Sequence, residues 1–123
     1  SENELFAVCG LHKKGYSLEY QLSELGAEYI ETVETAPDYK LYKLGTSPVK
    51  PGLVKGEKNS GEKIEVDLYS ISKNALGYFL DNVSSPLTIG TVELSDGRCV
   101  KGFLCEEYAV EDAEDITKLK KFA

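Results

Sequence analysis

The sequence predicts an α+β domain in which a mixed, barrel-like β-sheet of about six or seven strands carries two or three helices on its outside. Three observations indicate this class. Several short segments are rich in β-branched and aromatic residues or alternate between apolar and polar residues, as strands do. Two other segments repeat leucine or phenylalanine at helical spacing. An Asp-Gly pair between two apolar segments is typical of a β-hairpin. We expect residues 1–123 to form a single domain.

The first part of the chain predicts a buried strand, a polar loop and a short helix. Residues 5–9 are continuously apolar and Gly10 ends them, which favours a strand that is covered on both faces. After a polar loop over residues 10–15, Ser17 is placed to cap a helix with leucines at positions 18, 22 and 25. Gly26 is placed to end that helix.

The middle of the chain predicts three strands and a long loop. Residues 28–34 and 39–44 favour strands, with a turn over residues 36–38 between them. Residues 46–61 contain Pro48, Pro51 and three glycines, so we expect a loop with at most a short strand over 53–55. Residues 64–71 alternate between apolar and polar side chains, which predicts a strand with one face in water.

The last part of the chain predicts a second helix and a hairpin. Ser72 is placed to cap the helix, whose apolar stripe is Leu76, Phe79, Leu80 and Val83. Two strands, over residues 87–94 and 98–105, flank the turn at residues 95–97. The charged segment 111–123 is expected to end in a short helix or to fray.

Composition narrows the class of protein. Apolar residues make up 41% of the chain and charged residues 28%, and the net charge is −7. The basic residues are scattered, so we expect no nucleic-acid partner. No apolar run approaches the roughly 20 residues of a membrane span, and the first residues lack a signal-peptide pattern, so we expect a cytoplasmic protein with no membrane contact.

The three cysteines predict no metal site. Cys9, Cys99 and Cys105 lack the closely spaced pair of a zinc site, and we expect no metal and no cofactor. Cys9 and Cys105 each end an apolar run, which favours buried, reduced thiols.

His12 is the one histidine of the chain and the candidate for chemistry. It follows the glycine that ends a buried strand, where backbone amides of a tight turn can face an anion and an imidazole can supply a proton. The alternative is an ordinary exposed histidine in a loop.

The segment that contains His12 resembles a known family. Residues 5–15, Leu-Phe-Ala-Val-Cys-Gly-Leu-His-Lys-Lys-Gly, resemble the opening of the gamma-glutamyl cyclotransferase-like fold. The form with Cys before the glycine and His two residues after it is similar to the allophanate hydrolase C-terminal domain. Further matches follow in order along the chain, at residues 21–22, 24–27, 35–37, 39–42, 51–54, 86–92, 96–98, 101–106 and 115–117. The resemblance implies the gamma-glutamyl cyclotransferase-like fold.

The resemblance also implies a reaction. In the family, a large amidase domain hydrolyses allophanate with a serine nucleophile, and the C-terminal domain is associated with decarboxylating the N-carboxycarbamate product during urea degradation. This chain resembles the C-terminal domain alone, so we expect a decarboxylase-type domain without amidase activity of its own. The expected partners are the amidase domain, in cis or in trans, and a second copy in a homodimer. The chain is either an excised domain or a freestanding relative.

His12 is the expected catalytic residue. Loss of carbon dioxide from an N-carboxylate is eased by protonating the nitrogen and by removing water from the carboxylate. We interpret His12 as the proton donor or carboxylate-orienting group, and the amides around Gly10 and Leu11 as holding a small, anionic, dicarboxylate-like substrate. Four more residues are candidates for binding it: Lys40, Tyr42, Thr91 and Arg98. For these, a core tyrosine, a solvated lysine and a hairpin arginine are equally good interpretations.

Two alternative functions are open. Cyclotransferase activity needs a glutamate soon after the Leu-Asp pair that follows the second helix, but Leu80-Asp81 is followed by no glutamate before Glu93. A non-catalytic binding or assembly module that retains the fold is the other alternative, because N-carboxycarbamate loses carbon dioxide without help.

Overall fold

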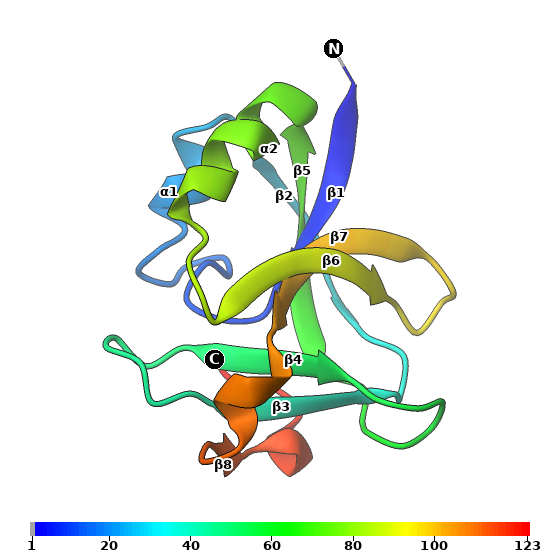
Figure 1. Cartoon of the computed structure of the whole chain (residues 1–123). Helices are drawn as coiled ribbons and strands as arrows, with labels where there is room; N and C mark the ends of the chain where they lie inside the picture. Colours follow the sequence, from blue (N-terminus) through cyan, green and yellow to red (C-terminus); the bar gives the residue numbers. More distant parts are fainter. Residues whose placement is uncertain (1) are drawn as a thin grey trace.

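The computed structural model describes residues 2–123 and contains two β-sheets (Figure 1). The five-stranded sheet has the order β2-β5-β1-β7-β6, and the three-stranded sheet has the order β4-β3-β8. The strands are β1 (Asn3–Val8), β2 (Glu28–Glu34), β3 (Tyr39–Lys43), β4 (Pro51–Lys55), β5 (Glu65–Ser72), β6 (Leu87–Glu93), β7 (Cys99–Cys105) and β8 (Glu114–Asp115). The predicted α+β class is confirmed. The edge strands β2 and β6 of the five-stranded sheet meet at a bridge between Thr35 and Leu94, just beyond their ends, but they do not pair along their length, so the sheet does not close into a full barrel.

The five-stranded sheet lies between two layers. In Figure 1, helices α1 (Tyr20–Ser23) and α2 (Lys73–Phe79) are at the upper left, and the three-stranded sheet lies at the bottom. The central strand β1 is antiparallel to β5 and parallel to β7, so the sheet is mixed, as predicted. No helix within residues 2–123 is long and apolar enough to cross a membrane.

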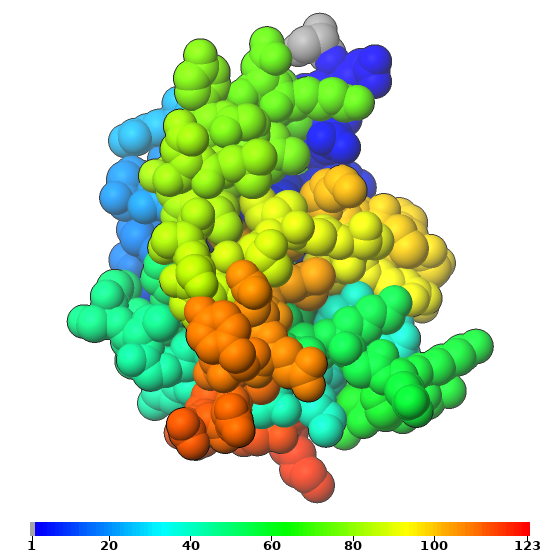
Figure 2. Space-filling view, in the orientation of Figure 1, coloured from blue at the N-terminus to red at the C-terminus, as the bar shows by residue number. Residues whose placement is uncertain are grey.

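Two hydrophobic clusters fill the spaces between these layers. Side chains alternate along β1, so Phe6 and Val8 join the cluster under the helices while Ala7 joins the cluster that also contains Leu41 of β3 and Leu53 of β4. Figure 2 shows the C-terminal segments, in orange, packed over the lower part of the molecule beside the β6–β7 hairpin, in yellow. The site described below lies where the two clusters meet, beyond the end of β1.

Strand β5 corrects one expectation. The alternation of residues 64–71 predicted a face in water, but Asp67 and Tyr69 on that face are 3% and 1% exposed. Strands β2 and β1 pair with both edges of β5, and the loop after β1 covers the polar face. Asp67 accepts hydrogen bonds there from the backbone N–H of Lys14 and the hydroxyl of Thr32. A buried carboxylate with two donors therefore occupies a position that resembles a solvent-facing one in sequence.

The first helix is shorter than predicted. It covers Tyr20–Ser23, Glu19 precedes it, and the Ser17 side chain caps nothing. The carboxylate of Glu19 instead accepts from the Tyr69 hydroxyl at 2.6 Å and from the Gly15 amide at 3.1 Å, which holds the preceding loop in turns. Gly26 ends this region with a φ of +79°, as expected.

The second helix and the hairpin follow the sequence prediction closely. The Ser72 hydroxyl caps α2 by accepting from the Ala75 amide, and Gly97 takes a φ of +92° in the turn between β6 and β7. The helix ends at Phe79, and a 3-10 turn (η1, Leu80–Asn82) follows it. Leu80 is therefore 47% exposed instead of lying on the apolar stripe.

The C-terminal segment does not fray. Two further 3-10 turns, η2 (Glu107–Val110) and η3 (Thr117–Leu119), flank β8. The Glu65 amide donates to the Lys120 carbonyl at 2.8 Å, and Phe122 packs against the cluster between the sheets. The ammonium of Lys13, next to His12, bonds both the Glu65 carboxylate and the Ala123 carbonyl. The tail is thereby attached to the loop that carries the candidate catalytic residue.

Candidate functional site

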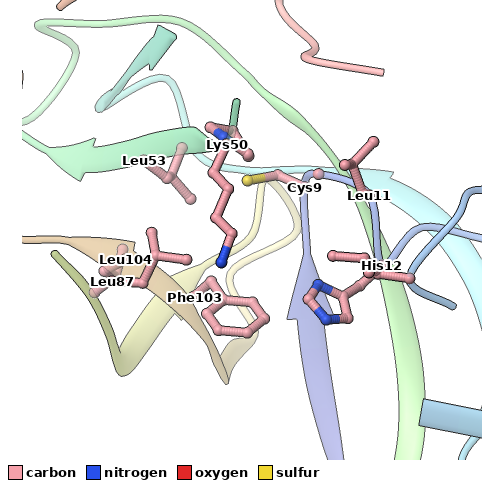
Figure 3. Close-up of a pocket in the computed structure, with 11 residues that line it drawn as sticks. Cys9, Leu11, His12, Lys50, Leu53, Leu87, Phe103 and Leu104 are labelled. Carbon is pink, nitrogen blue, oxygen red and sulfur yellow. The ribbon is translucent and has the colours of Figure 1, made fainter. Parts of the chain in front are cut away.

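A small pocket lies beyond the end of β1 (Figure 3). Its cavity measures about 30 Å³, and its walls are mostly apolar. The residues that line it are Cys9, Gly10, Leu11, His12, Leu18, Lys50, Pro51, Leu53, Leu87, Phe103 and Leu104. It therefore brings together the loop after β1, the start of β4 and the ends of the β6–β7 hairpin.

Gly10 determines how closely two of these segments approach. A Cβ atom on Gly10 would lie 2.7 Å from the Cδ and Cγ atoms of Pro51, a separation that side chains do not tolerate. Glycine at this position therefore lets Pro51 rest directly on the chain after β1. The contact places Lys50, the preceding residue, opposite His12 across the pocket.

His12 is half-buried between two aromatic rings. Its imidazole stacks on Phe103, with ring centroids 5.3 Å apart and planes inclined by 30°, and it meets the Phe79 ring edge-on at 5.4 Å. Its Nε2–H donates to Oε1 of Gln21 at 2.8 Å. With Nε2 engaged in this way, Nδ1 is the nitrogen that can exchange a proton with a ligand.

The environment keeps His12 neutral at neutral pH. Burial is the main cause that lowers the pKa of His12 below its ordinary value of 6.5, because the charged imidazolium loses hydration. The hydrogen bond to Gln21 acts in the opposite direction and raises the pKa, while the positive charge of Lys50 lowers it further. An anion that bound between Lys50 and His12 would remove the effect of Lys50 and favour the protonated imidazole.

Lys50 supplies an unpaired positive charge to the pocket. Figure 3 shows its side chain extending across the pocket past Cys9, with the ammonium group ending beside Phe103 and Leu104. Within residues 2–123, no carboxylate pairs with this ammonium and no side chain accepts a hydrogen bond from it. An ammonium group at an apolar wall without a counterion is well suited to bind an anion.

Cys9 is not activated. Burial raises the pKa of its thiol to about 12, and the nearby charge of Lys13 offsets this only in part. The protonated thiol therefore acts as part of the apolar wall. The predicted burial of Cys9 and Cys105 is confirmed, and Cys99 is exposed.

The structure brings some of the predicted site residues together and leaves others apart. Gly10, Leu11 and His12 line one pocket. Lys40 lines a separate open groove beside η3, and Tyr42 lies on β3 opposite Asp115 of β8. Thr91 borders a surface depression near the start of β1. Arg98 pairs with Asp96 and Glu31 at the hairpin, with distances of 2.8 and 3.1 Å.

Sequence reasoning missed Lys50, Gln21 and Phe103. Lys50 lies 38 positions after His12 in a proline-rich loop, and nothing in the local pattern indicates that it meets His12. The signal that could have indicated Lys50 is its position directly before residues 51–54, a segment that matches the family. Gln21 and Phe103 likewise lie inside matched segments, at 21–22 and 101–106.

No acidic side chain lines this pocket among the described residues. The segment after α2 contributes Leu87 to the wall, and Ser84 and Ser85 are exposed. The site thus lacks the carboxylate that a cyclotransferase needs as its base. In residues 2–123, no group of three or more His, Cys, Asp or Glu side chains is arranged to hold a metal ion.

The fold defines a broad class of protein. A solved gamma-glutamyl cyclotransferase superposes on 93% of this chain, and on 70% of its own length, with a TM-score of 0.64 at 12% identity. Such a distant likeness shows the fold alone. The predicted gamma-glutamyl cyclotransferase-like fold is confirmed.

Closer relatives define the family. The family described as the allophanate hydrolase C-terminal domain matches residues 4–123, and the chain belongs to it. A urea amidolyase of Lachancea kluyveri is 42% identical over 120 residues, which are 94% of this chain and 7% of that protein. A solved allophanate hydrolase of Kluyveromyces lactis matches with a TM-score of 0.93 and 38% identity, over 98% of this chain and 20% of that one. The chain therefore spans a small part of the length of these relatives.

Proposed function

We propose that this chain decarboxylates N-carboxycarbamate, acting as the C-terminal domain of an allophanate hydrolase in urea degradation. The observation that carries the proposal is the pairing of a half-buried, neutral imidazole with an unpaired ammonium on the wall of one apolar pocket. The membership of the allophanate hydrolase C-terminal domain family supports the choice of substrate.

The reaction needs one proton and a dry site. In N-carboxycarbamate, two carboxylates share one nitrogen. When the bond between nitrogen and one carboxylate carbon breaks, its electron pair goes to the nitrogen, which takes a proton from His12. The products are carbon dioxide and carbamate, and His12 regains its proton from water. Apolar walls favour this step because the carboxylate loses its charge as it leaves.

His12 gains its proton when the substrate binds. In the free protein, burial and Lys50 keep the pKa of His12 below 6.5. A dianion beside the ring reverses the local charge and favours the imidazolium, which then acts as the general acid. The backbone amides of Leu11 and His12 donate to no acceptor within residues 2–123, so they are free to bind a carboxylate oxygen.

The substrate comes from a separate active site. None of the described residues that line the pocket is a serine, so we assign the amidase step that forms N-carboxycarbamate to an amidase domain, in cis or in trans. We expect this chain alone to release no ammonia from allophanate. Ammonia release by the purified chain would contradict this division of labour.

A coupled assay tests the role of His12. The chain is added to a separately produced amidase domain with allophanate, and carbon dioxide and ammonia are followed together. The chain should accelerate carbon dioxide release over the amidase alone. His12→Phe keeps a ring between Phe79 and Phe103 but cannot transfer a proton, so it should lower this acceleration by about a hundredfold or more.

The outcomes separate catalysis from a binding role. Loss of the acceleration in a folded His12→Phe variant, with the ammonia of the amidase step still formed, supports the proposed acid. If folded wild-type chain gives no acceleration, or His12→Phe retains it, the domain is not a decarboxylase that uses His12. A binding or assembly module is then the better interpretation.

A further inference from the structure

The pocket has two unlike parts, and their chemistry indicates what each part holds. One part is formed by the ammonium of Lys50 and the loop after β1 that carries His12, and the other is an apolar wall of Leu53, Leu104 and Phe103. The cavity that they share is small, about 30 Å³, so a molecule with two carboxylates would contact both parts.

We propose that Lys50 binds the retained carboxylate of the substrate, while the apolar cavity lined by Leu53, Leu104 and Phe103 takes up the carboxylate that leaves as carbon dioxide. This inference rests on the proposed function, because it divides that substrate between the two parts. It makes Lys50 a binding residue and the leucine wall a group that acts by excluding water.

The position of Lys50 supports this division. Pro51 is fixed against Gly10, and the Leu44 amide donates to the Lys50 carbonyl at 2.9 Å, so the backbone on the C-terminal side of Lys50 is held. Its side chain points into the pocket with no protein counterion among the described residues (Figure 3). A substrate carboxylate at the ammonium would be the missing partner.

The wall supports the second half of the proposal. Leu53 is 2% exposed, and the Cys9 thiol beside it stays protonated. Within the described chain, Lys50 and His12 are the two ionisable groups besides that thiol which line the pocket. A carboxylate placed against the leucines is therefore poorly hydrated, and its conversion to uncharged carbon dioxide relieves this cost.

Malonate provides a stable probe, because a CH₂ group replaces the nitrogen between its two carboxylates. We expect malonate to bind the purified chain, observed by calorimetry and by the NMR signals of His12. Lys50→Met should weaken malonate binding by about tenfold to a hundredfold, since a charge-assisted bond is lost. Lys50→Arg should restore most of it. Lys58→Met, at an exposed loop position, is the matched control and should bind like wild type.

A second variant tests the wall separately from the charge. Leu104→Gln brings a hydrogen-bond donor to the cavity, which stabilises the charged carboxylate there. Malonate should therefore bind at least as tightly as to wild type, while carbon dioxide release in the coupled assay becomes slower. A folded Leu104→Gln variant with an unchanged rate would overturn the role of the apolar wall.

The two proposals can fail independently. If malonate does not bind, or Lys50→Met binds it as wild type does, the assignment of Lys50 is wrong even where His12→Phe abolishes catalysis. If malonate binding depends on Lys50 but the chain never accelerates carbon dioxide release, the carboxylate site stands and the decarboxylation is wrong.

Discussion

At the scale of single residues, the titration of His12 is governed by burial against Phe103 and Phe79. Its pKa is lowered in the folded chain, so in the window between that pKa and 6.5 the unfolded chain binds a proton that the folded chain does not. The free energy of unfolding therefore rises with pH across this window. The contribution is complete above pH 6.5 and is lost as the pH falls through the folded pKa.

The direction of the His12 pKa shift and of the resulting change in stability can both be measured directly. We expect an NMR titration of the His12 ring to give a pKa below 6.5, and the denaturant midpoint to fall as the pH is lowered from 6.5. Since His12 is the one histidine of the chain, His12→Phe should remove this part of the pH dependence. Lys50→Met should raise the pKa of His12, because a nearby positive charge is removed. A pKa at or above 6.5 in the wild-type chain would contradict the burial argument.

The packing of His12 also determines how much stability the protein loses when its ring is removed. A lone histidine after a glycine suggests an exposed loop residue, whose removal costs little. In the structure it packs on two rings and bonds Gln21, so we expect His12→Ala to cost about 1–3 kcal/mol of stability. Thermal unfolding measures this, with Ser17→Ala as an exposed control in the same region.

The three cysteines should differ in reactivity. Burial raises the pKa of Cys9 to about 12 and also raises the pKa of Cys105, whereas Cys99 is exposed beside the hairpin turn. A thiol reagent should therefore label Cys99 first, and label Cys9 and Cys105 slowly until the protein unfolds. Mass spectrometry of the timed reaction gives the order. Rapid labelling of Cys9 in the native chain would show that the pocket wall opens.

At the scale of elements, Ser17 and Ser72 form a matched pair, because the sequence predicts both as helix caps. The Ser72 hydroxyl accepts from the Ala75 amide, but Ser17 caps no helix. We expect Ser72→Ala to lower the free energy of unfolding by about 1 kcal/mol, since a cap is lost. Ser17→Ala should change it by less than about 0.5 kcal/mol. Equal effects in chemical denaturation would mean that the α2 cap contributes nothing.

The C-terminal segment is held in part by an ion pair in which the Lys13 side chain is buried. Lys13 is 3% exposed, and it joins the Glu65 carboxylate to the Ala123 carbonyl. Lys13→Met should destabilise the fold by about 1–3 kcal/mol and expose the tail to limited proteolysis. Lys118→Met, at an exposed position of η3, should do neither. A resistant tail in Lys13→Met would show that the packing of Phe122 and the backbone bond between Glu65 and Lys120 are enough to hold it.

Local patterns predict the elements whose signals are local. The Asp-Gly hairpin, the Ser72 cap and strand β2 with bounds 28–34 all follow from neighbouring residues. The first helix fails because the Glu19 side chain bonds Tyr69, 50 positions away, in place of a local cap. The tail is likewise fixed by long-range partners. Neither partner can be read from a short window of sequence.

At the scale of the whole molecule, contacts between residues far apart in the sequence explain why only part of the candidate site could be predicted. His12 and the amides of Gly10 and Leu11 are contiguous in sequence, so a single segment was enough to propose them. Lys50 reaches the pocket because Gly10 lets Pro51 pack against it, and that contact exists only after two sheets have assembled. The resemblance to a family could indicate such a residue, whereas charge and periodicity could not.

Strand β5 has a consequence for how the protein unfolds. Its edges pair with β1 and β2, and its side chains enter both hydrophobic clusters, Leu68 on one side and Tyr69 on the other. When the packing of one cluster is lost, β5 is released, and the other cluster loses the strand that supports it. Heat should therefore unfold the chain in one cooperative transition, and in native-state hydrogen exchange the amides of β5 should be among the last to take up deuterium, at the rate of global opening.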